Sequence, residues 1–172
     1  MKKVLLFTLV LFLSISAFAQ TQKIGYVDSQ TIMAQYSGAI KAQSDLEAIV
    51  AEWNTTIENM KKDYQRIVTD YNKKLPKMDE KAKKSATQDL AKREQEIVKY
   101  QQQKFGQGGE IYIKQEELLK PVRDKVKKAI AEVAKEEKMK FVFDKTGDAF
   151  LLFADSEFDI TFKVLDKLKR GK

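Results

Sequence analysis

Residues 45–80 read DLEAIVAEWNTTIENMKKDYQRIVTDYNKKLPKMDE, and this stretch decides the fold. Its large apolar side chains recur every three or four positions, which is the spacing of one face of a helix. They are Leu46, Ile49, Trp53, Ile57, Met60, Tyr64, Ile67 and Tyr71. The helix should end at Pro76, because proline disfavours helix in the residue before it and cannot donate a backbone hydrogen bond. The pattern predicts a helical hairpin with its tip near residues 73–78, and Asp79 is the expected cap of the return helix.

The two limbs of this hairpin differ in how well they can pack. Leu46 to Ile57 spans an eleven-residue repeat and favours a packed helix pair. The return limb is much more polar, because Glu94, Gln101, Gly108 and Gln115 interleave with its apolar seam. A seam of this kind cannot make a robust coiled coil alone. We therefore expect residues 46–106 to form an arm with a partly open apolar surface. The expected binding surface is Met60, Tyr64, Ile67, Tyr71, Ile97, Tyr100 and Phe105, and Tyr112 adds further aromatic surface.

Two positions weaken the expected helices. Ser37-Gly38 predicts a kink near the start of the first limb. Three glycines, Gly106, Gly108 and Gly109, interrupt the return limb, and each costs about 1 kcal/mol in a helix interior relative to Ala. They form either a loop between two helices or a hinge that lets the arm swing. Alignment of the limbs about Pro76 places Gly108 opposite Ser44, and Pro121 either kinks its helix or starts a new one.

The segments outside the arm predict a small α+β body made of residues 20–45 and 107–172. Residues 23–28 have the composition of a short strand, and Asp28 or Ser29 can cap the helix that follows. Residues 141–144 and 149–153 predict two further strands joined by a turn, as in a β-hairpin. A final amphipathic helix is expected over residues 159–169, with Asp155, Ser156 or Asp159 as its cap.

The expected strands carry more apolar surface than so small a body can bury. Self-association would cover this surface and pair the free strand edges. The expected oligomer interface consists of Ile24, Tyr26, Val27, Phe141, Phe143, Leu151 and Phe153. An oligomer of such bodies would carry its arms side by side.

The composition argues against an enzyme. The chain has no Cys and no His, which removes thiolate nucleophiles, thiolate metal sites and imidazole acid-base catalysis. Asp144 with Asp148, and Asp155 with Asp159, are the available carboxylate pairs, and turn and cap positions explain them more simply. We expect no catalytic residue, no cofactor and no metal site.

The N-terminus predicts export. Residues 1–19 combine two lysines, an apolar run and the sequence Ala17-Phe18-Ala19, which is typical of a signal peptide cleaved after Ala19. In a bacterium with two membranes the expected compartment is the periplasm. Without Lys2 and Lys3, 30 basic residues stand against 25 acidic ones. The excess gathers at the arm tip, in Lys73, Lys74, Lys77, Lys81, Lys83 and Lys84, and nucleic acid is not an expected partner.

The order of these segments resembles the Skp/OmpH family of periplasmic chaperones. The resemblance rests on Lys23-Ile24-Gly25-Tyr26-Val27-Asp28, on the charged hairpin, on Glu117-Leu118-Leu119-Lys120-Pro121 and on Phe143-Asp144-Lys145-Thr146-Gly147. It implies a jellyfish-like homotrimer with a β-rich body and three tentacles. It also implies an ATP-independent holdase that shields unfolded outer-membrane proteins before their insertion. The alternative is a structural or adaptor protein of the cell envelope, whose basic tip contacts anionic lipid headgroups or lipopolysaccharide. A third interpretation of the tip is that its lysines only keep it soluble.

Overall fold

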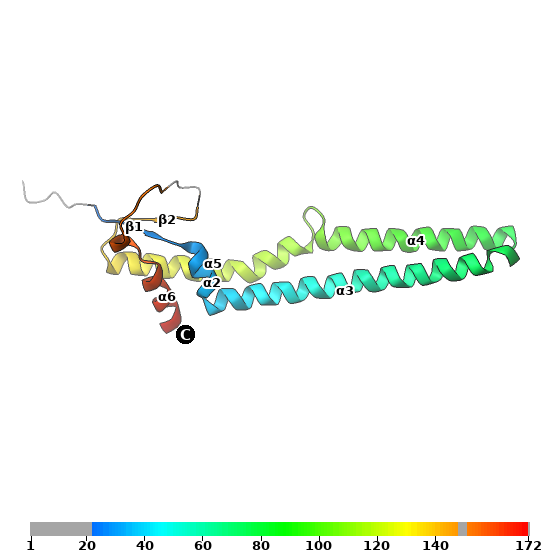
Figure 1. Cartoon of the computed structure of the whole chain (residues 1–172), viewed down its shortest axis with the longest axis horizontal. Coiled ribbons are helices and arrows are strands. Elements are labelled where there is room, and N and C mark those ends of the chain that lie inside the picture. Colours follow the sequence, from blue (N-terminus) through cyan, green and yellow to red (C-terminus); the bar gives the residue numbers. More distant parts are fainter. Residues whose placement is uncertain (1–21, 148–150, 172) are drawn as a thin grey trace, which may run out of the picture. The chain divides into compact units, whose positions relative to one another are not determined.

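The computed structural model describes residues 22–147 and 151–171. Contacts divide the chain into two units, each with its own core. One unit is Met33–Lys127, and the other combines the chain up to Ile32 with the chain from Lys128 onward. Figure 1 shows long helices and a small pair of strands, so the described chain is mostly helical and its sheet is smaller than the β-rich body of three strands that was expected.

The unit Met33–Lys127 is built around an antiparallel helical hairpin (Figure 1). Helix α3 spans Ser37–Lys74, a short 3-10 turn η2 spans Leu75–Lys77, and helix α4 returns over Glu80–Phe105. Tyr36 lies between α3 and the preceding helix α2, Ser29–Gln35, and its backbone is extended, with φ −76° and ψ 117°. The helix is therefore broken one residue before the expected kink at Ser37-Gly38.

The turn of the hairpin is centred on Asp79 and not on Pro76. The rings of Trp53 and Phe105 meet edge to face with their centroids 5.7 Å apart, and Tyr71 Oη lies 3.4 Å from Thr87 Oγ1. In both pairs, the midpoint between the two residue numbers is 79. Pro76 is accommodated inside η2, where its fixed φ suits the start of a helical turn. The expected pairing of Gly108 with Ser44 is therefore wrong, because it assumed a turn centred three residues earlier.

Asp79 starts the return helix. Its Oδ1 accepts a hydrogen bond of 2.7 Å from the backbone N–H of Ala82. This satisfies one of the N–H groups that the first turn of a helix leaves unpaired. The predicted cap is confirmed.

The core of the hairpin is confined to the end away from its tip. Leu46, Trp53 and Ile57 are buried on α3, and Ile97 is the buried residue of α4. No residue from 58 to 96 is buried. The well-packed and poorly packed parts of the hairpin thus lie where the apolar periodicity predicted them.

Helix α5 spans Glu110–Glu136 and contains Pro121 in its interior. Pro121 therefore neither ends the helix nor begins a new one. Between α4 and α5 the chain makes a tight turn over residues 106–109. None of the described helices is long and apolar enough to cross a membrane.

The second unit contains a two-stranded parallel sheet. Strand β1, Ile24–Val27, pairs with strand β2, Phe141–Asp144, in the register Ile24↔Phe141 and Tyr26↔Phe143. The predicted β-hairpin is not formed by the described residues, because the partner of β2 is the distant β1 and residues 151–153 form no strand beside it. Residues 151–153 have no strand structure, and 149–150 of the same predicted strand lie outside the described residues.

Helix α6, Thr161–Arg170, completes this unit (Figure 1). Its apolar face is fully buried, with Val164, Leu165 and Leu168 at 0–2% exposure. A 3-10 turn η3, Ser156–Phe158, precedes it, and Asp155 Oδ1 caps that turn by accepting from the N–H of Glu157. Asp159 Oδ1 accepts from the N–H of Thr161 at 2.8 Å. The N-cap position of α6 is occupied by Ile160, whose side chain makes no cap hydrogen bond, so none of the three predicted residues is the N-cap of this helix. Asp155 caps η3 instead, and Asp159 binds the first N–H of α6 from one residue before the cap position.

Candidate functional site

The expected binding surface of the arm consists mainly of half-buried side chains. Six of its seven residues have intermediate exposure, and these are Met60, Tyr64, Ile67, Tyr71, Tyr100 and Phe105. Aromatic rings and the Met thioether tolerate this position, because they can contact both water and apolar groups. The hairpin therefore carries an apolar seam that its own two helices cover only in part.

Ile97 does not belong to this partly open surface. It is 8% exposed and is the buried residue of α4. Its position on the heptad seam made it resemble its neighbours in the sequence, whereas in the structure it packs inside the hairpin. Its side chain stabilises the hairpin and presents almost no surface to a ligand.

Other apolar side chains are more exposed than the seam residues. Val98 and Tyr112 are each 57% exposed, Ile113 is 55% exposed and Ile40 is 52% exposed. Tyr112 was expected to add aromatic surface, but Ile40, Val98 and Ile113 lie off the apolar periodicity. The signal that could have found Val98 is that it directly follows the seam residue Ile97, so it must lie about 100° around the helix from the seam.

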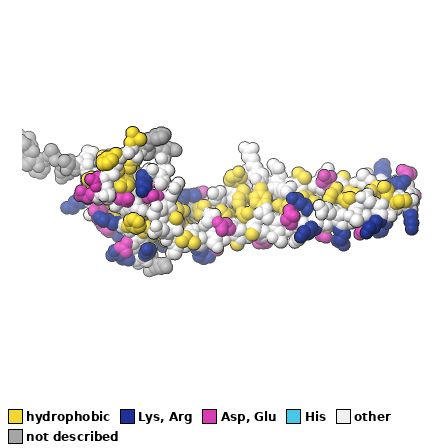
Figure 2. All heavy atoms as spheres, viewed as in Figure 1, with side chains coloured by type: hydrophobic (Ala, Val, Ile, Leu, Met, Phe, Trp, Pro, Cys, Tyr) yellow, Lys and Arg dark blue, Asp and Glu magenta, His cyan; other side chains and the backbone are white. Residues whose placement is uncertain are grey.

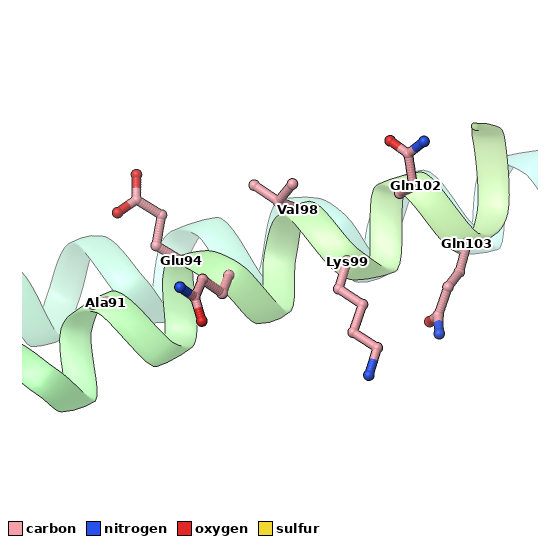
Figure 3. A pocket seen from close by; sticks show the side chains of 7 residues that line it. Ala91, Glu94, Val98, Lys99, Gln102 and Gln103 are labelled. Atoms are coloured by element: carbon pink, nitrogen blue, oxygen red, sulfur yellow. The ribbon is translucent and has the colours of Figure 1, made fainter. Parts of the chain in front are cut away.

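Val98 is the centre of a shallow groove along the outer side of α4. Glu94, Val98 and Gln102 point to the same side of the helix, while Lys99 and Gln103 point to the other (Figure 3). Ala91 and Gln95 complete the lining. The groove combines an apolar centre with amide and charged groups, so it offers weak and unspecific contacts.

The three glycines form a tight connection with a defined geometry. The N–H of Gly106 donates to Gln102 O at 2.9 Å, and the N–H of Gly109 donates to Gly106 O at 2.8 Å. Gly108 has φ +72°, in the left-handed region that favours glycine. A Cβ on Gly106 would lie 2.4 Å from Gln102 O, and one on Gly109 would lie 2.9 Å from Gly106 O.

This geometry decides between the two interpretations of the glycines in one respect. The segment is a break between two helices, as the first interpretation held. Whether the joint also swings stays a prediction. Replacement of all three glycines by Ala would disrupt the connection sterically, so that substitution cannot be used to stiffen it.

The basic tip gathers its six lysines around η2. Lys73 and Lys74 end α3, Lys77 belongs to η2, and Lys81, Lys83 and Lys84 lie in the first turns of α4. Dark blue side chains gather at this end of the hairpin in Figure 2. Lys83 pairs with Glu80 at 2.8 Å, and within the described chain the other five form no ion pair. Cations at the start of a helix are disfavoured by its dipole, so α4 gains no stability from this charge.

The sheet of the other unit exposes an apolar face. Ile24 is 47% exposed, Phe141 55% and Phe143 44%, and the strand register places all three on one face with Tyr26. Val27 points the opposite way and is 3% exposed, so it belongs to the core of the unit and not to this face. Leu151 and Phe153 are also exposed, at 39% and 84%, and they lie outside the strands.

Two carboxylates hold the edge of this unit together. Asp28 Oδ1 accepts a 2.7 Å hydrogen bond from the N–H of Thr31, which confirms the predicted helix cap, and Asp28 Oδ2 lies 3.1 Å from Lys145 Nζ. Asp144 Oδ1 accepts from the N–H of Ser29 and from the N–H and hydroxyl of Thr146. These contacts explain Asp28 and Asp144 as structural residues. In the described part of the chain no cluster of three or more acidic residues forms a metal site.

The comparisons with known proteins identify a family and similar solved structures. The family described as "Outer membrane protein (OmpH-like)" matches residues 23–168. A crystal structure of a candidate outer membrane chaperone (OmpH-like) from Caulobacter crescentus CB15 superposes with a TM-score of 0.77 at 14% sequence identity. The match covers 88% of this chain and 86% of that one. A search of curated proteins finds no match.

Proposed function

Because this chain belongs to the OmpH-like outer membrane protein family, we propose that it is an ATP-independent holdase chaperone of the periplasm. It binds unfolded outer-membrane proteins between its helical arms and prevents their aggregation before membrane insertion. It performs no enzymatic reaction. The shared fold of the Caulobacter crescentus candidate chaperone supports a chaperone role in general.

The observation that carries this proposal is the open seam of the hairpin. From residue 58 to residue 96 no side chain is buried, although α3 places apolar groups there at regular helical spacing. A coil that served only to hold itself together would bury these groups. The strand of an outer-membrane barrel is apolar at alternate positions only, so it requires many weak contacts and not a dry groove. Half-buried tyrosines and long lysine stems provide such contacts.

Oligomerisation would place several arms around one client. We propose that the exposed sheet face of Ile24, Tyr26, Phe141 and Phe143 is covered by further copies of the chain in a homotrimer. The support is the exposure of these side chains and the small size of a two-stranded sheet, which is marginal alone. Contacts among several arms would add up even when each is weak. Weak contacts also allow release without ATP.

The proposal is tested by refolding an outer-membrane barrel protein from urea in the presence of the mature chain. We expect a stoichiometric amount of trimer to suppress light scattering by the client. The double variant Y64S/Y71S should suppress it less, because it removes two half-buried rings of the seam. The matched control N54S/Q65S changes two exposed polar residues of α3 and should behave as the wild type. A client that aggregates equally with and without the wild-type chain would refute the holdase role.

A second candidate function is that of an envelope adaptor, and the basic tip favours it. Five of its six lysines lack an ion-pair partner in the described chain, and three lie at the helix end where the dipole disfavours them. This unfavourable interaction with the helix dipole suggests that the lysines bind an external anion, such as a lipid headgroup or lipopolysaccharide.

Vesicle binding tests the adaptor function. The variant in which the six tip lysines become Gln should lose binding to vesicles that contain anionic lipid or lipopolysaccharide. The control changes six exposed lysines elsewhere to Gln and has the same net charge; these are Lys41, Lys61, Lys62, Lys92, Lys99 and Lys127. Equal binding by both variants would count against a specific role of the tip.

A further inference from the structure

One lysine ties together the three helices that meet at the glycine break. Lys104 lies in the last turn of α4, and its Nζ is 2.5 Å from Oε2 of Glu110, in the first turn of α5. The same Nζ lies 4.8 Å from the ring centroid of Trp53, on α3, and 5.5 Å from that of Tyr100. A single ammonium group thus contacts both sides of the break and the opposite limb of the hairpin.

This contact is unlike the other ion pairs of the chain. The Lys104 side chain is 17% exposed, which is the lowest value for the basic partner of any ion pair between described residues. A cation is attracted by the face of an aromatic ring, and the attraction grows when water is excluded. The helix dipoles also favour this pair, because the Lys104 cation lies at the C-terminal end of α4 and the Glu110 anion lies at the N-terminal end of α5.

The backbone of the break does not hold α4 against α5 by itself. The backbone hydrogen bonds of the turn join residues three or four positions apart in the sequence. Its glycines have no side chains that could pack against a helix. Trp53 is 7% exposed and contacts Phe105, the last residue of α4. The side chains of Lys104 and Phe105 therefore connect the end of α4 to Trp53 on α3.

We propose that Lys104 is a latch that holds the joint at residues 106–109 closed. With the latch closed, the ammonium fixes the start of α5 to the end of α4 and covers the ring of Trp53. With the latch open, the joint exchanges between conformations and Trp53 becomes exposed to water. The latch is a property of the hairpin itself and does not rest on the proposed chaperone function.

Hydrogen exchange of the mature chain, measured by mass spectrometry without any client, tests the latch. K104M keeps an unbranched apolar side chain and removes the charge. It should speed exchange of the amides at residues 106–112 about tenfold, since the ion pair and the cation–π contacts are lost together. K104R keeps a cation that can pair with Glu110 and lie over the aromatic rings, so it should stay within about twofold of the wild type.

The acidic partner offers a matched pair of variants. E110Q removes the carboxylate that bridges the break and should also speed exchange at 106–112. E117Q makes the same chemical change about two helical turns further along α5. Glu117 pairs with Lys114 within α5 at 2.7 Å, so E117Q should leave exchange at the break unchanged. The single Trp of the chain adds an optical measurement, because its emission should shift to the red in K104M and not in K104R.

Three outcomes would overturn the latch. One is exchange at 106–112 that is the same in K104M as in E117Q. Another is equal acceleration in K104R and K104M, because the cation would then have no part in holding the joint. The third is acceleration that extends equally to residues 60–75, which would indicate general destabilisation of the hairpin.

Discussion

At the scale of single residues, Asp28 and Asp144 link the sheet to the start of α2. The hydrogen bond from the N–H of Thr31 lowers the pKa of Asp28. Burial acts to raise this pKa, but the hydrogen bond and the nearby Lys145 ammonium together outweigh burial. Burial acts to raise the pKa of Asp144, but the hydrogen bonds from Ser29 and Thr146 outweigh it, so the pKa is lowered in sum. In both residues the folded protein favours the carboxylate.

Because the folded pKa values of Asp28 and Asp144 are lowered, the stability of this unit depends on pH. The stabilisation is complete above the unfolded pKa of about 3.9 and is lost as the pH falls through the lower folded value. We expect D28N and D144N to reduce the stability of the sheet at pH 7, and the difference from wild type to shrink as the pH falls below about 4. Exchange of the β1 and β2 amides in urea measures this. D89N, at an exposed position of α4, is the control, and a difference that is constant from pH 7 to pH 3 would contradict the linkage.

At the scale of elements, the hairpin and its weak seam could be predicted from the sequence. Helical periodicity is local information, and so are the caps Asp28 and Asp79 and the glycine break. The strand at 141–144 was also predicted with its observed bounds. These features depend only on neighbouring residues.

Features that depend on distant partners could not be predicted. The pairing of β2 with β1 in parallel needs the whole helical region as its crossover, while a local apolar pattern favours a β-hairpin. Val27 and Ile97 were assigned to binding surfaces because their residue types fit, but burial depends on the packed fold. The latch was missed because it joins Lys104 to Trp53, which are far apart in the sequence.

The difference between Ile97 and Val98 gives a test of the hairpin core. Ile97 is 8% exposed and Val98 is 57% exposed, although they are neighbours on α4. I97A should reduce the free energy of unfolding by about 2–4 kcal/mol, because it removes buried methylene groups and leaves a cavity. V98A should change it by less than about 0.5 kcal/mol. Urea unfolding followed by circular dichroism compares them, and equal effects would show that the two helices do not pack through Ile97.

At the scale of the whole molecule, each of the two units leaves apolar surface uncovered. The hairpin has an open seam, and the other unit has an exposed sheet face. Uncovered apolar surface of this kind indicates interaction sites. The two surfaces differ in regularity. The side chains of the sheet face are fixed by strand register, which suits identical copies, whereas the seam is long and mixed in chemistry, which suits variable partners.

A charge on the sheet face tests the first of these roles. Phe143 is 44% exposed and lies beside Tyr26 in the strand register, so F143D should dissociate the proposed trimer, because burying an unpaired carboxylate is costly. Sedimentation velocity measures the mass of the particle. V98D places the same charge on an apolar residue of α4 that is 57% exposed, and it should leave the mass unchanged. An F143D chain that sediments with the mass of the wild-type oligomer would exclude this face as the interface, and a wild-type chain that sediments as a monomer would exclude the trimer itself.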